Sequence, residues 1–545
     1  MRVVLIVWLF VLQLPAAALR TRGSKDDYDA IVYGATPAGI QAALAIAGEG
    51  RTALLVTSEP IVGGMMTGGL GATDTGNSSA IGGASGAFFR AVCAAYNRSV
   101  PASGGCFTFE PHVAMSIFTS LLSAASSRVS VLLNSTLVSA AATGSRVTSV
   151  AFADTAIAET ATSRAELRSL ASLNVSAQVF IDATYEGDLL AAADLPTAIG
   201  REGRVMYNES HAGVLEEPSS FGQHQFKVHF SAFNATTGNP LPLISRAPPG
   251  AVGDGDGKVQ AYNFRLCMTS EASNRAAFPV PEVYDPLEWE IARRHIAVSN
   301  VTRLASLMNL VAIPGSKTDT NNNGPISTDF IGASYDWPAA TPRARRDIFN
   351  AHVEYTLGFF YFLQHDEAIP PALRAEALQW GLAADEFLPN RHLPSQLYVR
   401  EGRRLVGDFV FTQRDRQTSI HKNDSIGLFS YNIDSHHVQR YVNAEGGVYN
   451  EGDFELYGGP LGQIPYRVLL PPRGVAGSAN VLAPVPLSAS HMGYGCLRLE
   501  PQLMILGQSA GIAATMAMAS GVDVQDIDVG ALQSRLRELG QKIDL

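Results

Sequence analysis

Three histidines in the last quarter of the chain have side chains that could carry acid–base chemistry. His491 lies in the segment SASHMGYG, and His436 and His437 are adjacent in NIDSHHVQR. An imidazole titrates near neutral pH, so each of these residues could transfer a proton or hold a substrate oxygen. A structural histidine is an equally good interpretation of His491. We treat all three as candidate catalytic residues.

Two arginines supply a possible anion-binding pair. Arg400 and Arg404 lie four residues apart in QLYVREGRRLVGD, which would place them on one face of a helix. Guanidinium groups bind carboxylates and other anions through paired hydrogen bonds. The alternative is pairing with a neighbouring acid, Glu401 or Asp408. The spacing of histidines, cysteines and acids fits no zinc signature, so we expect no metal.

The elements that would position such groups begin near the N-terminus. The segment DAIVYGATPAGIQAALAIAGEGRTALLVTSEP has the pattern of a strand, a turn, a helix and a strand. Gly34 and Gly39 match the first and third glycines of the dinucleotide fingerprint G-x-G-x-x-G, with Thr36 at the middle position. Thr36 suits an N-cap and Pro37 the first helical position. Two glycines are a weak match, and a plain turn is the alternative.

The second strand of this unit departs from the fingerprint. An acid that binds the ribose is expected about 20 residues after the glycines. Thr57 stands at that place, and Glu59 follows two residues later. Glu59 could reach a ribose, although a loop carboxylate is nearly as good an interpretation.

Small residues mark two further segments. The segment GGMMTGGLGATDTGNSSAIGGASG has a glycine density typical of backbone that approaches a ligand closely. Near the C-terminus, a helix is predicted to begin at Glu500-Pro501. Gly507, Gly511 and a run of alanines give this helix a face suited to close packing.

Several long motifs occur in one order along the chain and carry a specific resemblance. They are GATPAGI, VGGMMTGGLGATDTG, IDATYEGDLLA, GREGRVMYNESHAGV, AYNFRLCMT, QLYVREGRRLVGD, SYNIDSHHVQR, IPYR and LSASHMGYGCLRLEPQLMILGQSAGIAA. This series resembles the FAD-dependent oxidoreductase family that carries a split, glutathione-reductase-like flavin domain. The resemblance covers nearly all of the chain after its first residues. A threonine–proline turn is ordinary in that family, whereas Thr57 departs from its pattern.

The resemblance implies an α/β fold with a Rossmann-like, GR2-like FAD-binding domain that is split in sequence. Residues 27–204 and 456–540 would form its two parts. Residues 205–455 are richer in proline, asparagine and aromatic residues and would form an inserted α+β substrate or cap domain.

The resemblance also implies the cofactor, FAD, and the residues around it. The first helix would meet the pyrophosphate, the glycine-rich segment would follow the flavin, and the C-terminal helix would direct its positive end at the flavin ring. The backbone before a hairpin at ATGSR would contact the adenine. The implied cofactor-binding residues are Gly34, Thr36, Pro37, Ala38, Gly39, Glu59, Gly63, Gly64, Met65, Met66, Thr67, Val138, Asp182, Ala183, Thr184, Ser490, Glu500, Pro501 and Gln502.

The N-terminus and composition indicate a secreted or endomembrane-lumenal glycoprotein. Residues 1–18 have the charged, apolar and small-residue regions of a signal peptide, with a membrane anchor as the alternative. No later apolar run predicts a membrane span. Eight N-x-[ST] sequons and two cysteines that could bridge, Cys93 and Cys106, agree with secretion.

The net charge of −10 argues against nucleic acid as a partner, and Arg345-Arg346 is predicted to lie on a solvated face.

We therefore expect an enzyme that oxidises a small organic substrate by hydride transfer to the flavin, with oxygen or another electron acceptor. One alternative is a flavin-fold protein with structural FAD or non-redox, lyase-like activity. Another is a nonenzymatic secreted binding protein. The sequence names neither the substrate nor the acceptor.

Overall fold

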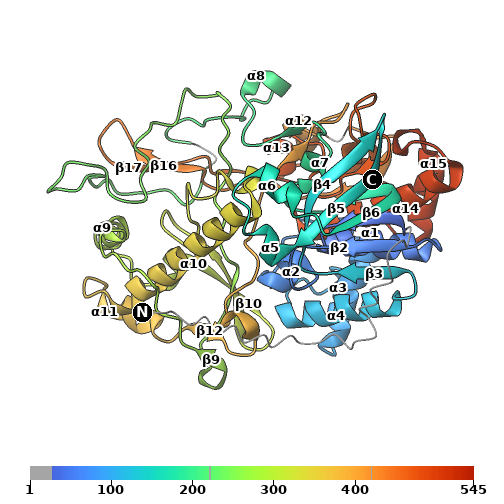
Figure 1. Cartoon of the computed structure of the whole chain (residues 1–545). Helices are drawn as coiled ribbons and strands as arrows, with labels where there is room; N and C mark the ends of the chain where they lie inside the picture. Colours follow the sequence, from blue (N-terminus) through green and yellow to red (C-terminus); the bar gives the residue numbers. More distant parts are fainter. Residues whose placement is uncertain (1–27, 220–221, 419) are drawn as a thin grey trace.

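The computed structural model describes residues 28–219, 222–418 and 420–545, so the predicted signal peptide lies outside the described residues. The described chain forms two regions that lie side by side in Figure 1. One contains a parallel sheet built from both ends of the chain. The other contains a smaller sheet and helices from the middle of the chain. The α/β fold class is therefore confirmed.

The main sheet has the strand order β3-β2-β1-β6-β5-β4, and β20 also pairs with β6. Strands β1, β2, β3, β6 and β20 run parallel, whereas β4 and β5 form an antiparallel hairpin that continues from β6. Apolar residues such as Ile31, Leu55 and Phe180 are buried on both faces, as expected for a parallel sheet. The strands are β1 (Tyr28–Tyr33), β2 (Ala53–Val56), β3 (Val129–Leu132), β4 (Ser135–Thr143), β5 (Arg146–Asp154), β6 (Leu173–Asp182) and β20 (Val481–Leu482).

Helices α1 (Pro37–Gly48) and α14 (Glu500–Ser520) pack directly against each other beside this sheet. The close approach depends on glycine. A Cβ at Gly507 would lie 2.1 Å from the Ala38 oxygen, and one at Gly511 would lie 2.5 Å from the Ala42 oxygen. The small-residue face predicted for the C-terminal helix is thus confirmed. The packing of α1 on α14 brings the N-terminal and C-terminal segments of the chain together in one helical layer beside the main sheet.

Further helices cover the same region. Cys93 and Cys106 form a disulfide beside α3, as the sequence allowed. Helix α14 is the one described helix long and apolar enough to cross a membrane, but 78% of its apolar window is buried inside the protein. The helices are α2 (Gly64–Gly68), α3 (Gly83–Ala95), α4 (Pro111–Ala124), α5 (Thr155–Ala158), α6 (Arg164–Ser169), α7 (Asp188–Ala192), α13 (His491–Tyr494) and α15 (Val529–Glu538).

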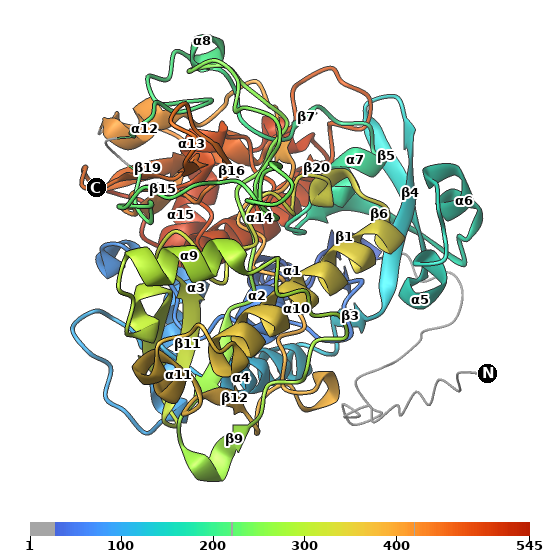
Figure 2. The same cartoon turned by 90° about the vertical axis from the view of Figure 1, so that its left-hand side faces the viewer.

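The middle of the chain supplies a second sheet with the order β10-β11-β8-β12-β9. The long helix α10 packs here through aromatic rings, with Trp289 stacked against Phe359 and Phe362. In Figure 2, α9, α10 and α11 face the viewer. The elements are β8 (Leu266–Thr269), β9 (Arg275–Ala276), α9 (Glu290–Val298), β10 (Met308–Ile313), β11 (Lys317–Asn322), α10 (Pro342–His365), α11 (Pro371–Ala377) and β12 (Gly381–Ala383).

Short two-stranded pairs connect the two regions. Strand β13 pairs with β7, and β14 pairs with β19 and contacts α14. The chain therefore returns to the first region before residue 456, and the boundaries at 205 and 455 stay a prediction. The elements are β7 (Thr197–Ala198), α8 (Arg204–Tyr207), β13 (Arg404–Leu405), α12 (Gln413–Gln417), β14 (Ser425–Phe429), β15 (Ile433–Ser435), β16 (Gln439–Val442), β17 (Val448–Glu451), β18 (Phe454–Leu456) and β19 (Gly462–Pro465).

The helix contact predicts a steric effect of substitution. Gly507→Ala should lower the free energy of unfolding by about 2 kcal/mol, because the new Cβ overlaps the Ala38 backbone and cannot be relieved by a side-chain rotation. Gly48→Ala is the matched control, since a Cβ there meets nothing within 4 Å. We expect thermal unfolding to show a lower midpoint for Gly507→Ala and no loss for Gly48→Ala. Equal midpoints would contradict the packing argument.

Candidate active site

A cavity of about 630 Å³ opens where the parallel strands β1, β2 and β6 end. It is the usual place for a ligand in an open α/β sheet, because the turns after the strands leave a crevice there. Its walls come from the turns after these strands, from the start of β4, from α5–α6, and from the inserted region around α10. The cavity therefore lies between the two regions of the protein.

The turn after β1 is shaped for backbone approach. Gly34 has a φ of +104°, and a Cβ there would lie 2.5 Å from the Ala183 carbonyl carbon. Thr36 caps α1, since its hydroxyl accepts from the Gly39 amide at 3.2 Å and donates to the Ala183 oxygen at 2.8 Å. Pro37 occupies the first turn. The cap and proline predicted here are confirmed.

The turn after β6 is held by a buried acid. Asp182 accepts from the amide and hydroxyl of Thr184 at 3.0 and 2.6 Å and from the Leu190 amide at 2.9 Å. Asp182 is fully buried and does not line the cavity, so it shapes the turn that places Thr184 in the cavity wall. Burial raises the pKa of Asp182 to about 6.

The far end of the cavity lies at an irregularity in the pairing of β4 with β5. The Leu137 amide donates to the Tyr33 hydroxyl at 3.0 Å, but the pairing of β4 with β5 skips Val138 at a bulge. Val138 lines the cavity, so its backbone can meet a ligand. Glu59 also lines the cavity, and burial together with Glu186 raises its pKa to about 7.

The predicted cofactor-binding residues divide into two sets. Six line the cavity: Gly34, Thr36, Glu59, Gly64, Val138 and Thr184. The others shape the surrounding backbone or lie deeper, and their roles stay predictions. These are Pro37, Ala38, Gly39, Gly63, Met65, Met66, Thr67, Asp182, Ala183, Ser490, Glu500, Pro501 and Gln502.

The start of α14 carries buried polar atoms that have no hydrogen-bond partner within the protein. Both amide atoms of Gln502 and one carboxyl oxygen of Glu500 are of this kind. The other Glu500 oxygen accepts from the Tyr185 hydroxyl, which in turn accepts from the Met65 amide at 3.0 Å. Burial raises the pKa of Glu500 to about 8. Unpartnered buried polar atoms are costly, so they indicate a ligand or solvent at this helix end.

A second group of charges surrounds the ring of Tyr398. Three buried arginines lie around it: the guanidinium carbons of Arg265 and Arg400 are 5.0 and 5.2 Å from the ring centre, and Arg498 reaches its hydroxyl at 3.4 Å. Each arginine is paired with its own aspartate. These pairs are Arg265–Asp319 at 2.6 Å, Arg400–Asp329 at 3.0 Å and Arg498–Asp434 at 2.8 Å.

The His436 ring lies between the aspartates of two of these pairs. Its Nδ1 lies 3.0 Å from an Asp329 oxygen, whereas its Nε2 is 3.7 Å from Asp434, too far for a hydrogen bond. Burial and then Arg400 lower the pKa of His436 to about 4. The ring is therefore neutral at pH 7, with Nδ1–H directed at Asp329 and Nε2 open.

The glycine-rich segment packs against the same group. Asp319 accepts from the amides of Gly71 and Ala72 at 2.6 and 2.8 Å, and Arg265 donates to the Ala72 oxygen at 3.3 Å. The inserted region thus holds this segment in place through its charged side chains. His436 and the glycine-rich segment consequently belong to one assembly.

His491 is engaged at both ring nitrogens. Its Nδ1 lies 2.7 Å from Glu401 and its Nε2 3.2 Å from the Ser435 hydroxyl, while its amide donates to Glu202 at 2.8 Å. Burial and then Arg404 lower its pKa to about 3. The residue begins α13 and, like His436, does not line the cavity. Both ring nitrogens are thus occupied by protein groups, and the catalytic role of His491 stays a prediction.

The arginine pair is not arranged as predicted. No helix contains Arg400 and Arg404: Arg400 lies in irregular backbone and Arg404 begins β13. Arg404 pairs with Glu202 at 2.7 Å and with Glu401, so the alternative of an acidic neighbour is correct for it. The prediction that both arginines lie on one helical face was wrong. The backbone between them passes through Gly402 and then pairs with β7 as strand β13, so it is extended.

His437 faces away from the others. Its Nε2 lies 3.2 Å from the His224 carbonyl oxygen, and its Nδ1 has no partner within the protein. Burial lowers its pKa to about 3. It lines a separate cavity of about 190 Å³ beside β17.

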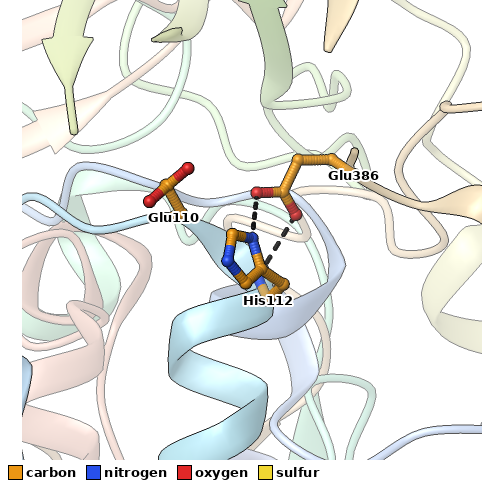
Figure 3. A group of neighbouring side chains, drawn as sticks. All are labelled: Glu110, His112 and Glu386. Carbon is orange, nitrogen blue, oxygen red and sulfur yellow. Dashed lines mark hydrogen bonds and ion pairs between the residues drawn. The ribbon is translucent and has the colours of Figure 1, made fainter. Parts of the chain in front are cut away.

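Two groups of side chains in the described residues have metal-like spacing, although no metal was expected from the sequence. In Figure 3, Glu110, His112 and Glu386 converge. The Lys317 ammonium already sits among these carboxylates, 2.6 Å from Glu110 and 3.0 Å from Glu386, and supplies the positive charge.

The second group consists of His224, Asp453 and Glu455. The His224 Nδ1 accepts the Gly324 amide at 3.1 Å, which leaves a proton on Nε2, the nitrogen that faces the two acids. A protonated nitrogen is not a metal ligand, so this second group is a poor metal site. The first group is also a poor metal site, because Lys317 already balances its carboxylates.

Comparison with known proteins identifies the family. The chain matches the family model described as FAD dependent oxidoreductase over residues 29–536. The protein belongs to this FAD-dependent oxidoreductase family. A search of curated proteins found no match.

The solved structures that this chain matches are only weakly similar to it. The crystal structure of THI4 from Thermovibrio ammonificans is 16% identical, covers 32% of this chain and 66% of that chain, and has a TM-score of 0.25. The L-proline dehydrogenase from P. horikoshii is 11% identical, covers 33% and 59%, and has a TM-score of 0.23. The myxobacterial halogenase CndH is 16% identical, covers 32% and 41%, and has a TM-score of 0.22. The chain thus spans about two fifths to two thirds of these proteins, and such scores add no argument.

FAD is the cofactor of this oxidoreductase family, and the residues present fit it. The Gly34 turn excludes a side chain where the pyrophosphate would approach, and Val138 offers free backbone where the adenine would lie. Gln502 and Glu500 offer unpartnered polar atoms at the positive end of α14. When bound, FAD supplies the redox chemistry.

Several cavity residues of the oxidoreductase escaped the sequence analysis. Two of them, Glu186 and Asp188, stand inside the quoted motif DATYEGD, which was a usable signal. The inserted region contributes others that no local pattern marks, because only the fold brings them over the cavity. These residues are Trp337, Arg345, Arg346, Phe349, Gln396 and Arg403.

The buried carboxyl of Glu500 predicts a pH effect in the apoprotein. Its pKa rises from 4.5 in the unfolded chain to about 8 when folded, so the folded state binds the extra proton between these values. Stability should therefore fall as the pH rises from about 5 to 8, and Glu500→Gln should flatten that dependence. Thermal midpoints of both apoproteins across this range would measure it. An unchanged slope in the variant would contradict a protonated Glu500.

Proposed function

We propose that this protein is a secreted or lumenal FAD-dependent oxidoreductase that oxidises a small organic substrate by hydride transfer to the flavin N5. Oxygen or another acceptor would then take the electrons. The family match supports the redox class, and the cavity at the carboxyl ends of β1, β2 and β6 supports the cofactor position.

The observation that carries the proposal furthest is the Asp329–His436 pair. Asp329 fixes the imidazole orientation through Nδ1, and burial keeps the ring neutral, so Nε2 remains available as a proton acceptor. Oxidation of an alcohol or amine requires removal of a proton from the O–H or N–H group as the hydride leaves the neighbouring carbon. His436 is suited to accept that proton. His491 has no comparable free nitrogen, since Glu401 and Ser435 occupy both.

The charge arrangement favours an uncharged substrate. Arg265, Arg400 and Arg498 would each attract an anion if they were free, but each already pairs with an aspartate. Burying a further carboxylate beside three neutralised pairs would cost desolvation without a matching cation. A neutral hydroxyl compound such as a sugar fits this group better than a hydroxy acid.

Location outside the cytosol is supported by two features. The Cys93–Cys106 disulfide agrees with an oxidising compartment. Sequon asparagines such as Asn97, Asn174 and Asn300 are exposed and accessible to glycosylation.

Endoglycosidase treatment of protein from a eukaryotic secretory host should increase its gel mobility, and N-terminal sequencing should begin near Leu19. A full-length, unglycosylated product would contradict this location.

Anaerobic mixing with sugars, amines and hydroxy acids tests the reaction. We expect bleaching of the flavin absorbance with a neutral hydroxyl compound and no bleaching with hydroxy acids. A flavin that every substrate leaves oxidised would favour the structural or non-redox alternative. Protein that binds no flavin after reconstitution would favour a nonenzymatic binding protein.

Substitution of His436 tests the proton acceptor. His436→Ala should slow flavin reduction by about 100-fold or more while FAD stays bound, because general-base catalysis is lost. His365→Ala, at the exposed end of α10, is the matched control and should keep the wild-type rate. Stopped-flow absorbance would measure both rates. A wild-type rate in His436→Ala would remove His436 from the mechanism.

A further inference from the structure

Of the two adjacent arginines, Arg345 is largely buried, contrary to the predicted solvated face, whereas Arg346 is half exposed, as predicted. Both stand in the first turns of α10 and line the cavity of about 630 Å³ at the ends of β1, β2 and β6, which we call the nucleotide cavity because FAD would occupy it. In Figure 2, one end of α10 reaches toward β4, β5 and β6, the strands that border this cavity. The error arose because charged pairs on a helix are usually solvated, and nothing local shows which residues the helix end meets.

Arg345 makes the inner contact. Its guanidinium binds Asp188 through two bonds of 2.5 and 2.8 Å, and it also donates to the carbonyl oxygens of Trp337 and Pro338 at 3.0 Å each. Arg403 donates to the same Asp188 at 3.0 Å. The Arg345 side chain is only 17% exposed. A two-bond arginine–carboxylate pair of this burial fixes orientation strongly.

Trp337 strengthens the inner contact from the same side. Its indole N–H donates to a Glu186 carboxyl oxygen at 3.0 Å. Glu186 and Asp188 belong to the turn after β6 that lines the cavity. Both acids of this turn are therefore bound by groups of the inserted region, Asp188 through both carboxyl oxygens and Glu186 through one.

Arg346 makes the outer contact, on the opposite wall. It binds Glu159 through two bonds of 3.0 and 2.6 Å, and Glu159 follows directly after α5. This pair is more accessible, with the Arg346 side chain 49% exposed. Arg164 of α6 adds a bond of 3.5 Å to the Ala339 oxygen. The start of α10 thus bridges the cavity from the β6 turn to the α5–α6 wall.

We propose that Arg345 and Arg346 form a clasp that holds the inserted region closed over the cofactor and so controls how fast FAD is released. The proposal rests on FAD occupying this cavity, as the proposed function requires. The two contacts are ion pairs between regions far apart in the sequence, at 188 and 345 and at 159 and 346. Opening the cavity across this side requires both to break, because each region holds one half of each pair.

The rate of FAD release from the intact holoprotein tests the clasp. After dilution into FAD-free buffer, free flavin fluorescence should rise about threefold faster for Arg346→Gln, since its pair is partly exposed. Arg345→Gln should release FAD roughly tenfold faster, since its pair is more buried and its two bonds reach both oxygens of Asp188, whereas those of Arg346 share one oxygen of Glu159. Arg346→Lys, which keeps the charge, should recover most of the wild-type rate.

Matched controls separate the clasp from loss of charge or folding. Arg343→Gln removes a charge from the same helical turn, where the exposed Arg343 has no ion pair among the described residues, and should leave the rate unchanged. The double variant Glu159→Arg with Arg346→Glu should restore slow release, although each single change accelerates it. This pair is on the surface, so it keeps the test available if Arg345→Gln fails to fold. Hydrogen exchange of residues 155–169 should rise in step with the release rate.

Two outcomes overturn the clasp. Release at the wild-type rate from both Arg345→Gln and Arg346→Gln, with FAD retained by the wild type, would exclude it and leave the proposed function intact. A wild-type protein that never retains FAD would exclude both proposals together. Failure to bleach with any substrate, with release accelerated as expected, would remove the proposed reaction and keep the clasp.

Discussion

Direct contact between the backbones of α1 and α14 is the constraint on which the rest of this structure depends. Gly507 and Gly511 leave no room for a Cβ against α1, so the N-terminal turn and the C-terminal helix are held at a fixed separation. That contact places the unpartnered atoms of Gln502 and Glu500 near the parallel strand ends. A flavin site split between the two ends of a chain of 545 residues requires such a rigid junction.

Many buried charged side chains of this protein form ion pairs. Three aspartates neutralise the three arginines at Tyr398, and carboxylates likewise surround the buried Lys317. Unpaired ions would be too costly in a buried position. The Nε2 of His436 carries no charge beside these pairs and can still accept a proton. The three arginine–aspartate pairs around Tyr398 are thus electrically balanced next to this basic atom.

Local sequence signals predicted the parts of the fold that depend on neighbours in the chain. The cap at Thr36, the hairpin of β4 and β5, and the start of α14 at Glu500 all follow from residues within a few positions of each other. The same reasoning failed for Arg400 and Arg404, because strand pairing with β7 extends that backbone. It also failed for the largely buried Arg345, whose partner Asp188 lies more than 150 residues away.

The sequence by itself determined the family, the cofactor and the order of the elements, because motifs such as GATPAGI and DATYEGD encode turn geometry locally. Only the tertiary structure decided which side chains share a site. It separated His436, with an open nitrogen, from His491, whose nitrogens are both bonded, and it brought α10 over the nucleotide cavity. The physical reason is that backbone conformation follows from short-range sterics and hydrogen bonding, whereas charge pairing and burial depend on residues brought together from distant segments.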